Sequence, residues 1–280
     1  MRPLESLSDE IVKYRILKPH KRNGLNLHDK ALAHLCETVG IDESHPEYNK
    51  FSQVINLVNQ AYLKIALKEF ESVRSVNPAK EVESEFNFLM ALYNKHIREH
   101  QVMFLLFNIF ETAIRSKAAV ELSRKYSTPS EDDWLHDPEL MPSKIAHTVS
   151  KAKEIILQDG EDSDAMDTFQ IFDYILLGGL KSLYKAFWSD LSHLFEEKEF
   201  KGHLLSKIGK RSMETMMESI RKARNDNAHH KPFHKSRKRR HMIVEDIELI
   251  LAHLNFNLAD AVNNIDPDHK IIKLKLNNVH

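Results

Sequence analysis

The chain has 280 residues and a net charge of -1, with 40 Lys and Arg against 41 Asp and Glu. Apolar residues make up 42% of the sequence, which is enough for a substantial core and excludes a disordered chain. Only 7 glycines occur, too few for a fold that depends on tight turns or phosphate-cradling loops. The single cysteine, Cys36, cannot form an internal disulfide, so we expect a cytoplasmic protein.

The sequence also argues against a membrane protein. Its longest apolar run, residues 102–107, ends at Asn108, far short of the ~20 residues needed to span a bilayer. Residues 1–5 lack the apolar core of a signal peptide. Because the overall charge is balanced, any polyanionic partner must be bound by a local basic patch.

Helical periodicity dominates the first 126 residues. We expect helices near residues 8–17, 27–39 and 47–75; in the last, Phe51, Val54 and Ile55 follow helical spacing. Asn77 and Pro78 read as the N-cap and first position of a further helix. That helix is expected to run to Tyr126, with one possible break near residues 94–96.

The second half alternates helices with polar connections. Prolines and acids predict a surface loop over residues 127–142, and an acidic connector is expected over 159–164. Helices are predicted at residues 142–158, 165–200 (one long or kinked helix interrupted at Gly178 and Gly179), 211–225 and 244–265. Alternating residues 271–276 predict a short terminal strand or an unfixed tail.

These elements predict an all-α fold. We expect an N-terminal helical extension over residues 1–85 and a compact helical bundle over residues 86–265. Residues 266–280 form the expected C-terminal tail or short strand.

One helix carries an arginine on its apolar face. Met213, Met216, Met217 and Ile220 form a helical stripe, and the next position of that stripe is Arg224. The arginine stem could simply pack while its charged head reaches water at the helix end. The sequence that follows gives a second interpretation.

Residues 225–230 are short and polar, and such residues stop helices. His229 lies five positions after Arg224, about 140° around an ideal helix. The two side chains therefore converge only if the helix ends or distorts between them, which this composition favours. A histidine near a helix C-terminus also lies in a field that favours its protonated form.

An arginine and a histidine together suit RNA cleavage without a metal. The imidazole moves protons near neutral pH, and the guanidinium stabilises the charge of a phosphorane. RNA supplies its own nucleophile, the 2′-hydroxyl, so DNA should be inert. Because one histidine cannot easily act as acid and base at once, we expect a homodimer that contributes two copies.

A basic segment follows the motif, over residues 221–241. Its predicted RNA-binding residues are Arg221, Lys222, Lys235, Arg237, Lys238, Arg239 and Arg240. A charge run of this kind can also be a solvated loop with no partner.

The motif resembles a known family. Residues 224–230 are similar to the Arg-Asn-x-x-Ala-His-His signature of Abi-like (abortive infection) proteins, which belong to the HEPN superfamily (higher eukaryotes and prokaryotes nucleotide-binding). Residues 110–115, with Glu111 and Arg115, are similar to the early helix of that family. Residues 183–191 resemble its middle aromatic helix. The resemblance covers roughly residues 104–233.

The resemblance implies a dimeric HEPN-like helical bundle with metal-independent RNase activity in bacterial defence or toxin systems. It assigns Arg224 and His229 as the catalytic pair, with Asn225 and His230 in supporting positions. Further partners would be an antitoxin, or a guide or non-coding RNA. Two alternatives stay open: a non-catalytic RNA-binding module, and a helical subunit that binds proteins through its N-terminal extension.

Glu111 and the histidines near residue 230 each allow more than one interpretation. Glu111 lies four positions before Arg115, which suits either a structural ion pair or a polar stripe that orients the Arg224 side chain. The histidines near residue 230 could suggest zinc. However, Pro232 interrupts the helix that would align His230 with His234, and cysteine ligands are absent from this segment. We expect no metal and no cofactor.

Overall fold

The computed structural model describes residues 27–77, 82–128, 132, 134–137, 139–232 and 237–276. It is mostly helical, which confirms the predicted all-α class. The chain divides into two compact units, residues 1–92 and 93–280. The division falls inside helix α5 (Glu85–Tyr126), whereas the sequence suggested a boundary at residue 85. The helix expected at residues 8–17 lies outside the described residues.

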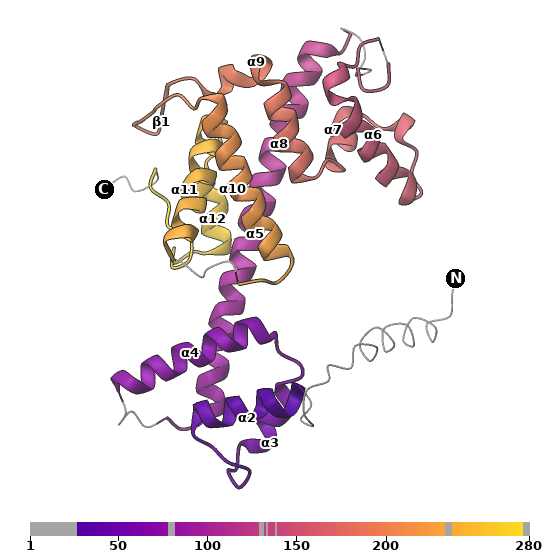
Figure 1. Ribbon diagram of the computed structural model, residues 1–280. Coiled ribbons are helices and arrows are strands. Elements are labelled where there is room, and N and C mark those ends of the chain that lie inside the picture. Colours follow the sequence, from indigo (N-terminus) through magenta and orange to yellow (C-terminus); the bar gives the residue numbers. More distant parts are fainter. Residues whose placement is uncertain are drawn as a thin grey trace. The chain divides into compact units, whose positions relative to one another are not determined.

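The first unit is built from α2 (Leu27–Val39), α3 (Tyr48–Val54), α4 (Gln60–Val76) and the start of α5 (Figure 1). The fully buried residues Leu35, Phe51 and Phe70 form part of its core. The single helix expected over residues 47–75 is wrong, because two helices occupy this range. Asn59 separates them by accepting backbone N–H bonds from Ala61 and Tyr62, which caps α4.

The start of α5 differs from the prediction as well. Asn77 is the C-cap of α4, its N–H bonded to the Val73 carbonyl, so it does not open the next helix. That helix begins at Glu85, and the Glu47 carboxylate accepts the Phe86 N–H at 3.1 Å near its first turn. From there α5 runs unbroken through residues 94–96.

The second unit packs the remainder of α5 with the later helices (Figure 1). Its helices are α6 (Ser143–Gln158), η1 (Ser163–Ala165), α7 (Thr168–Asp173), α8 (Leu177–Ala186), α9 (Trp188–Leu191), η2 (Ser192–Phe195), α10 (Lys210–Ala228), α11 (Arg237–His253) and α12 (Leu258–Ile265). Their apolar faces meet in one core that includes Phe110, Ile114, Leu180, Ile220 and Ile247, all with no exposed surface.

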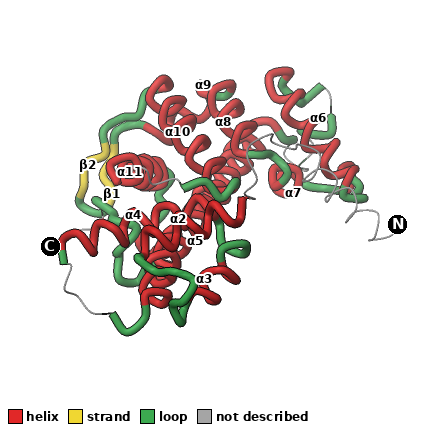
Figure 2. Tube along the Cα trace, turned by 60° about the horizontal axis from the view of Figure 1, so that its bottom comes forward, coloured by secondary structure: helices red, strands yellow, loops and turns green. Residues whose placement is uncertain are grey.

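The long helix predicted over residues 165–200 is wrong. The chain there forms α7, α8, α9 and η2, and then the strand β1 (Lys198–Phe200). β1 pairs with β2 (His203–Leu205) in an antiparallel hairpin, the small yellow element in Figure 2. Gly179 lies inside α8, where a Cβ would come within 2.8 Å of Ile175 and 3.2 Å of Thr148 on α6. The glycine therefore marks close helix packing.

The connection between α5 and α6, which was predicted to be a surface loop, is partly buried. Trp134 is fully buried, and its indole N–H donates to the Thr168 hydroxyl at 2.8 Å. Asp132 accepts both the backbone N–H and the hydroxyl of Thr168, each at 2.8 Å. This part of the loop fixes the start of α7.

The C-terminal region also departs from the prediction. The helix expected over residues 244–265 is two, α11 and α12, and α11 begins earlier, at Arg237. Residues 271–276 form no strand. Their backbone is held by two carboxylates instead: Asp266 accepts the N–H groups of residues 271 and 272, and Glu248 accepts those of residues 275 and 276.

Candidate functional site

The motif residues lie on α10 and just after it. Met213, Met217 and Ile220 are buried along one face of this helix, as its apolar spacing predicts. Arg224 continues the same face one turn later, and its side chain is 33% exposed. The arginine thus sits at the edge of the core, where its stem can pack and its charge must be satisfied by a partner or by solvent.

That partner is Glu111 on α5. The Arg224 Nε–H donates to Glu111 Oε1 at 2.6 Å, and the glutamate side chain is only 8% exposed. Arg115 lies 3.9 Å from the same carboxylate. The Arg224 side chain makes no other hydrogen bond to a described residue, so its Nη groups stay available to an anion.

Helix α10 ends at Ala228, later than the boundary predicted at Asn225. It ends there in a Schellman motif with His230 at the C′ position: the His230 N–H bonds to the Asn227 carbonyl, and the Lys231 N–H bonds to that of Asp226. His230 has φ +50°, a left-handed conformation that favours glycine. His229 is the C-cap and is exposed.

This regular end keeps Arg224 and His229 apart. The expected distortion between them is absent, so their separation of about 140° around the helix persists. No hydrogen bond joins the two side chains. Within one chain, therefore, the pair does not converge on a common point.

A second set of contacts surrounds Asn227. Its side chain is 1% exposed, and its Nδ2 lies 3.1 Å from both the carbonyl and the Nδ1 of His100 on α5. The His100 ring also lies against that of His230, with centroids 5.0 Å apart. Burial, together with the neighbouring His230, lowers the pKa of His100.

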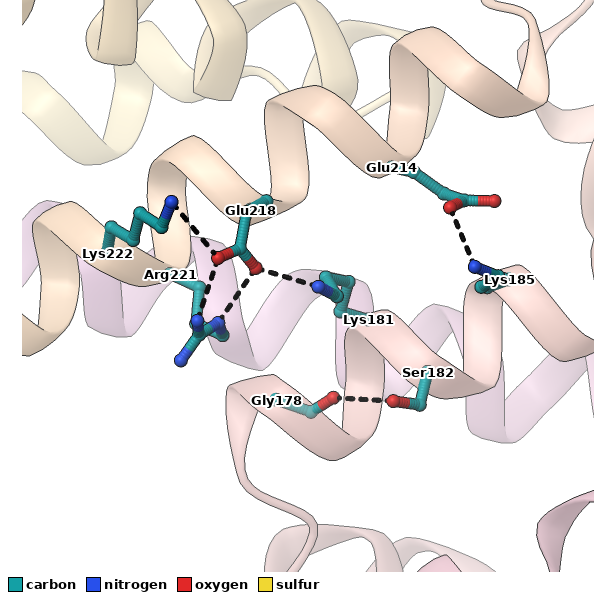
Figure 3. A network of polar contacts seen from close by, with 8 residues as sticks. All are labelled: Gly178, Lys181, Ser182, Lys185, Glu214, Glu218, Arg221 and Lys222. Atoms are coloured by element: carbon teal, nitrogen blue, oxygen red, sulfur yellow. Dashed lines mark hydrogen bonds and ion pairs between the residues drawn. The ribbon is translucent and has the colours of Figure 1, made fainter.

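Arg221 and Lys222 lie on α10 and are largely neutralised there. Glu218 accepts Arg221 through two nitrogens, at 3.0 and 2.8 Å, and lies 3.6 Å from the Lys222 ammonium (Figure 3). Lys181 on α8 donates to the same carboxylate at 2.7 Å. These hydrogen bonds outweigh partial burial and lower the pKa of Glu218 to about 2.

The remaining predicted RNA-binding residues fall near the start of α11. Arg240 is 12% exposed and lies 3.0 Å from Glu99, so it is committed to an ion pair. Arg239 lies 3.5 Å from Asp226. Lys238 is exposed and has no ion pair within the described residues. Lys235 and the Arg237 side chain lie outside the described part of the chain.

A cavity of about 500 Å³ opens beside Arg224, between α6, α8 and α10. Four basic residues line it: His147 and Lys151 from α6, and Arg221 and Arg224 from α10. Asn225 lines it too, with no side-chain hydrogen bond to a described residue. No acidic residue belongs to the lining.

Sequence reasoning missed His100, His147 and Lys151. Each lies on a helix far from the motif in sequence, and a lone basic residue on a polar helix face gives no signal of its own. Asn227 was seen only as part of a polar helix stop, although its burial is what lets the helix continue.

The described residues hold no group of three or more His, Cys, Asp or Glu side chains placed to bind one metal ion. None of the described helices has both the length and the apolar character needed to span a bilayer.

Comparisons with known proteins add no relative. No family model, no curated protein and no solved structure matches this chain.

Proposed function

We propose that this protein is a metal-independent endoribonuclease in which Arg224 and His229 form the catalytic pair. The observation that carries the proposal is the state of Arg224. A buried glutamate holds the Nε edge of its guanidinium at 2.6 Å, while its Nη groups make no hydrogen bond to a described residue and lie beside a cavity whose lining includes four basic residues. Such an arrangement presents an oriented cation to a phosphate.

The proposed reaction needs only RNA and these side chains. One His229 imidazole accepts the proton of the 2′-hydroxyl as its oxygen attacks the adjacent phosphorus. Arg224 stabilises the resulting phosphorane. The bond from phosphorus to the 5′-oxygen then breaks, and the same His229, now protonated, gives that oxygen its proton in this second step. The products are a 2′,3′-cyclic phosphate and a 5′-hydroxyl.

The geometry of α10 supports a homodimer. Arg224 and His229 lie about 140° apart around a regular helix, which does not favour the approach of both to one phosphate within a single chain. We propose that each scissile phosphate meets Arg224 of one protomer and His229 of the other. The exposed position of His229 at the helix end leaves it accessible to a second copy.

The biological setting is proposed from the resemblance to Abi-like HEPN proteins. That resemblance favours a role in bacterial defence or in a toxin system, acting in the cytoplasm. An antitoxin, or a non-coding RNA, would then restrain the nuclease.

The primary test compares RNA and DNA of the same sequence in EDTA. We expect the wild type to cut RNA alone and to leave a cyclic phosphate, and we expect Arg224→Ala and His229→Ala each to abolish cutting. Glu214→Ala, on the same helix, is the matched control and should retain activity close to that of the wild type, because Glu214 pairs only with Lys185 among the described residues. Cleavage that survives both active-site substitutions would refute the assignment.

A complementation test addresses the shared site. Mixing equal amounts of Arg224→Ala and His229→Ala chains under exchange should yield heterodimers with one intact site each. Random pairing then restores about a quarter of wild-type activity. An inactive mixture, despite proven exchange of subunits, would mean that each site is built within one chain.

A non-catalytic RNA-binding module is the second candidate. The observation that favours it is the divergence of Arg224 and His229 within the chain. It predicts salt-sensitive RNA binding without any cyclic-phosphate product.

A further inference from the structure

The cavity between α6, α8 and α10 has the composition of an anion-binding pocket. Its lining contains four basic residues and no acid. Lys151 and His147 are exposed and lie one turn apart on α6, and neither makes an ion pair with a described residue. Arg224 brings the Nη groups that Glu111 leaves free.

The carboxylates that pair with Arg221 and Arg224 are not part of the lining, and each also pairs with another cation. They are shared, so the cations outnumber them. The cations are Arg115, Lys181, Arg221, Lys222 and Arg224, and the carboxylates that pair with them are Glu111, Asp173 and Glu218. Asp173 is itself 71% exposed and therefore weakly coupled to its partner.

Apart from Thr148, Ser182 and Asn225, the rest of the lining is apolar or aromatic. Ile155, Leu176 and Leu177 contribute apolar side chains, and Tyr174 contributes an aromatic one. The Tyr174 hydroxyl is beside Glu161, and burial together with that acidic surrounding raises the pKa of the phenol, so its hydroxyl stays neutral. A volume of about 500 Å³ falls within the range of small-ligand sites. Cations next to an aromatic ring suit a phosphate joined to a base.

We infer that this cavity is a nucleotide subsite, which holds the RNA nucleotide next to the scissile phosphate. Lys151 and His147 bind its phosphate, and Tyr174 stacks against its base. The inference rests on the proposed function for its position beside Arg224. The basic lining and the volume of the cavity, however, do not depend on the proposed function.

The test measures RNA binding without cleavage, in a His229→Ala background. A fluorescent oligoribonucleotide is titrated, and its anisotropy gives the affinity at several salt concentrations. Lys151→Glu should weaken binding at least tenfold and reduce the slope of log affinity against log salt by about 0.7, the value for one phosphate contact on a single strand. Tyr174→Leu, which keeps an apolar side chain, should weaken binding about tenfold through lost stacking.

Lys153→Glu is the matched control. Lys153 lies on α6 as well, but it faces Asp164 at 3.3 Å and does not line the cavity. We expect it to change the affinity less than twofold. If Lys151→Glu and Lys153→Glu weakened RNA binding equally, the subsite would be refuted. Equal losses of affinity would mean that the net charge of the protein, and not the cavity, determines binding. Circular dichroism confirms that each variant is folded.

A second arm separates the RNA strand from a free nucleotide. A nucleoside 3′-monophosphate should bind at least a hundredfold more weakly than the oligonucleotide, and Lys151→Glu should weaken both. Tight binding of the free nucleotide, with oligonucleotide affinity unaffected by Lys151→Glu, would overturn the proposal.

The subsite and the nuclease can fail separately. If the wild type cuts RNA and Lys151→Glu cuts it with unchanged kcat/KM, the subsite is wrong and the nuclease stands. If no RNA is cut but Lys151→Glu still weakens binding as above, the nuclease is wrong and the cavity remains an RNA site.

Discussion

The contact between Arg224 and Glu111 should be a strong and measurable coupling. Glu111 is 8% exposed and accepts one charged hydrogen bond of 2.6 Å, while Arg115 is too distant, at 3.9 Å, to replace it. Removing one partner of a fully buried pair costs about 3–5 kcal/mol. Since Arg224 is one-third exposed, we expect a smaller coupling energy of about 2 kcal/mol.

A double-mutant cycle with Glu111→Gln and Arg224→Met isolates this coupling. Urea unfolding followed by tryptophan fluorescence is the suitable assay. The only two tryptophans, Trp134 and Trp188, both lie in the unit of residues 93–280, so the signal reports on that unit.

The control cycle uses Lys185 and Glu214, an ion pair between α8 and α10 with side chains 58% and 31% exposed (Figure 3). Its coupling should stay below about 1 kcal/mol because water screens exposed pairs. A coupling at Glu111 no larger than this control would refute the view that the carboxylate holds the guanidinium in place.

Three further predictions concern stability. His230→Gly should raise the melting temperature, because glycine relieves about 1 kcal/mol of left-handed strain at φ +50°, whereas His230→Ala should not. Burial would raise the pKa of Asp190, but hydrogen bonds from Lys125 and Tyr126 outweigh it and hold that pKa at about 2. Asp190→Asn should therefore lower the urea midpoint at pH 7, with a deficit that is complete above pH ~4 and narrows as pH falls towards 2. Burial chiefly raises the pKa of Asp246 to about 6, so the wild type should lose stability as pH rises from ~4 through 6. Asp246→Asn should match it at pH 4 and have the higher urea midpoint at pH 8.

The sequence predicts those elements whose apolar spacing is long and regular. α2 and α6 fall close to their expected ranges, and the face of α10 was visible from its methionines. The hairpin at residues 198–205 was missed, since strands of three residues are too short to show a period.

Helix ends that depend on tertiary partners could not be predicted. Asn227 is a poor helix residue by itself, yet α10 continues through it because its buried amide bonds to His100. Similarly, Glu111 appeared as a local partner of Arg115, while its shortest bond is to Arg224, 113 positions away. Residue spacing along one helix predicts which side chains of that helix are neighbours. It does not predict which side chains of another helix contact them.

The carboxylates that bind the last described residues have a consequence for synthesis. The Asp266 carboxylate accepts the N–H groups of residues 271 and 272, and the Glu248 carboxylate accepts those of residues 275 and 276. During translation these acids leave the ribosome before their donors do. The second unit can therefore assemble its helices early, but it reaches its final packing only once residue 276 has emerged.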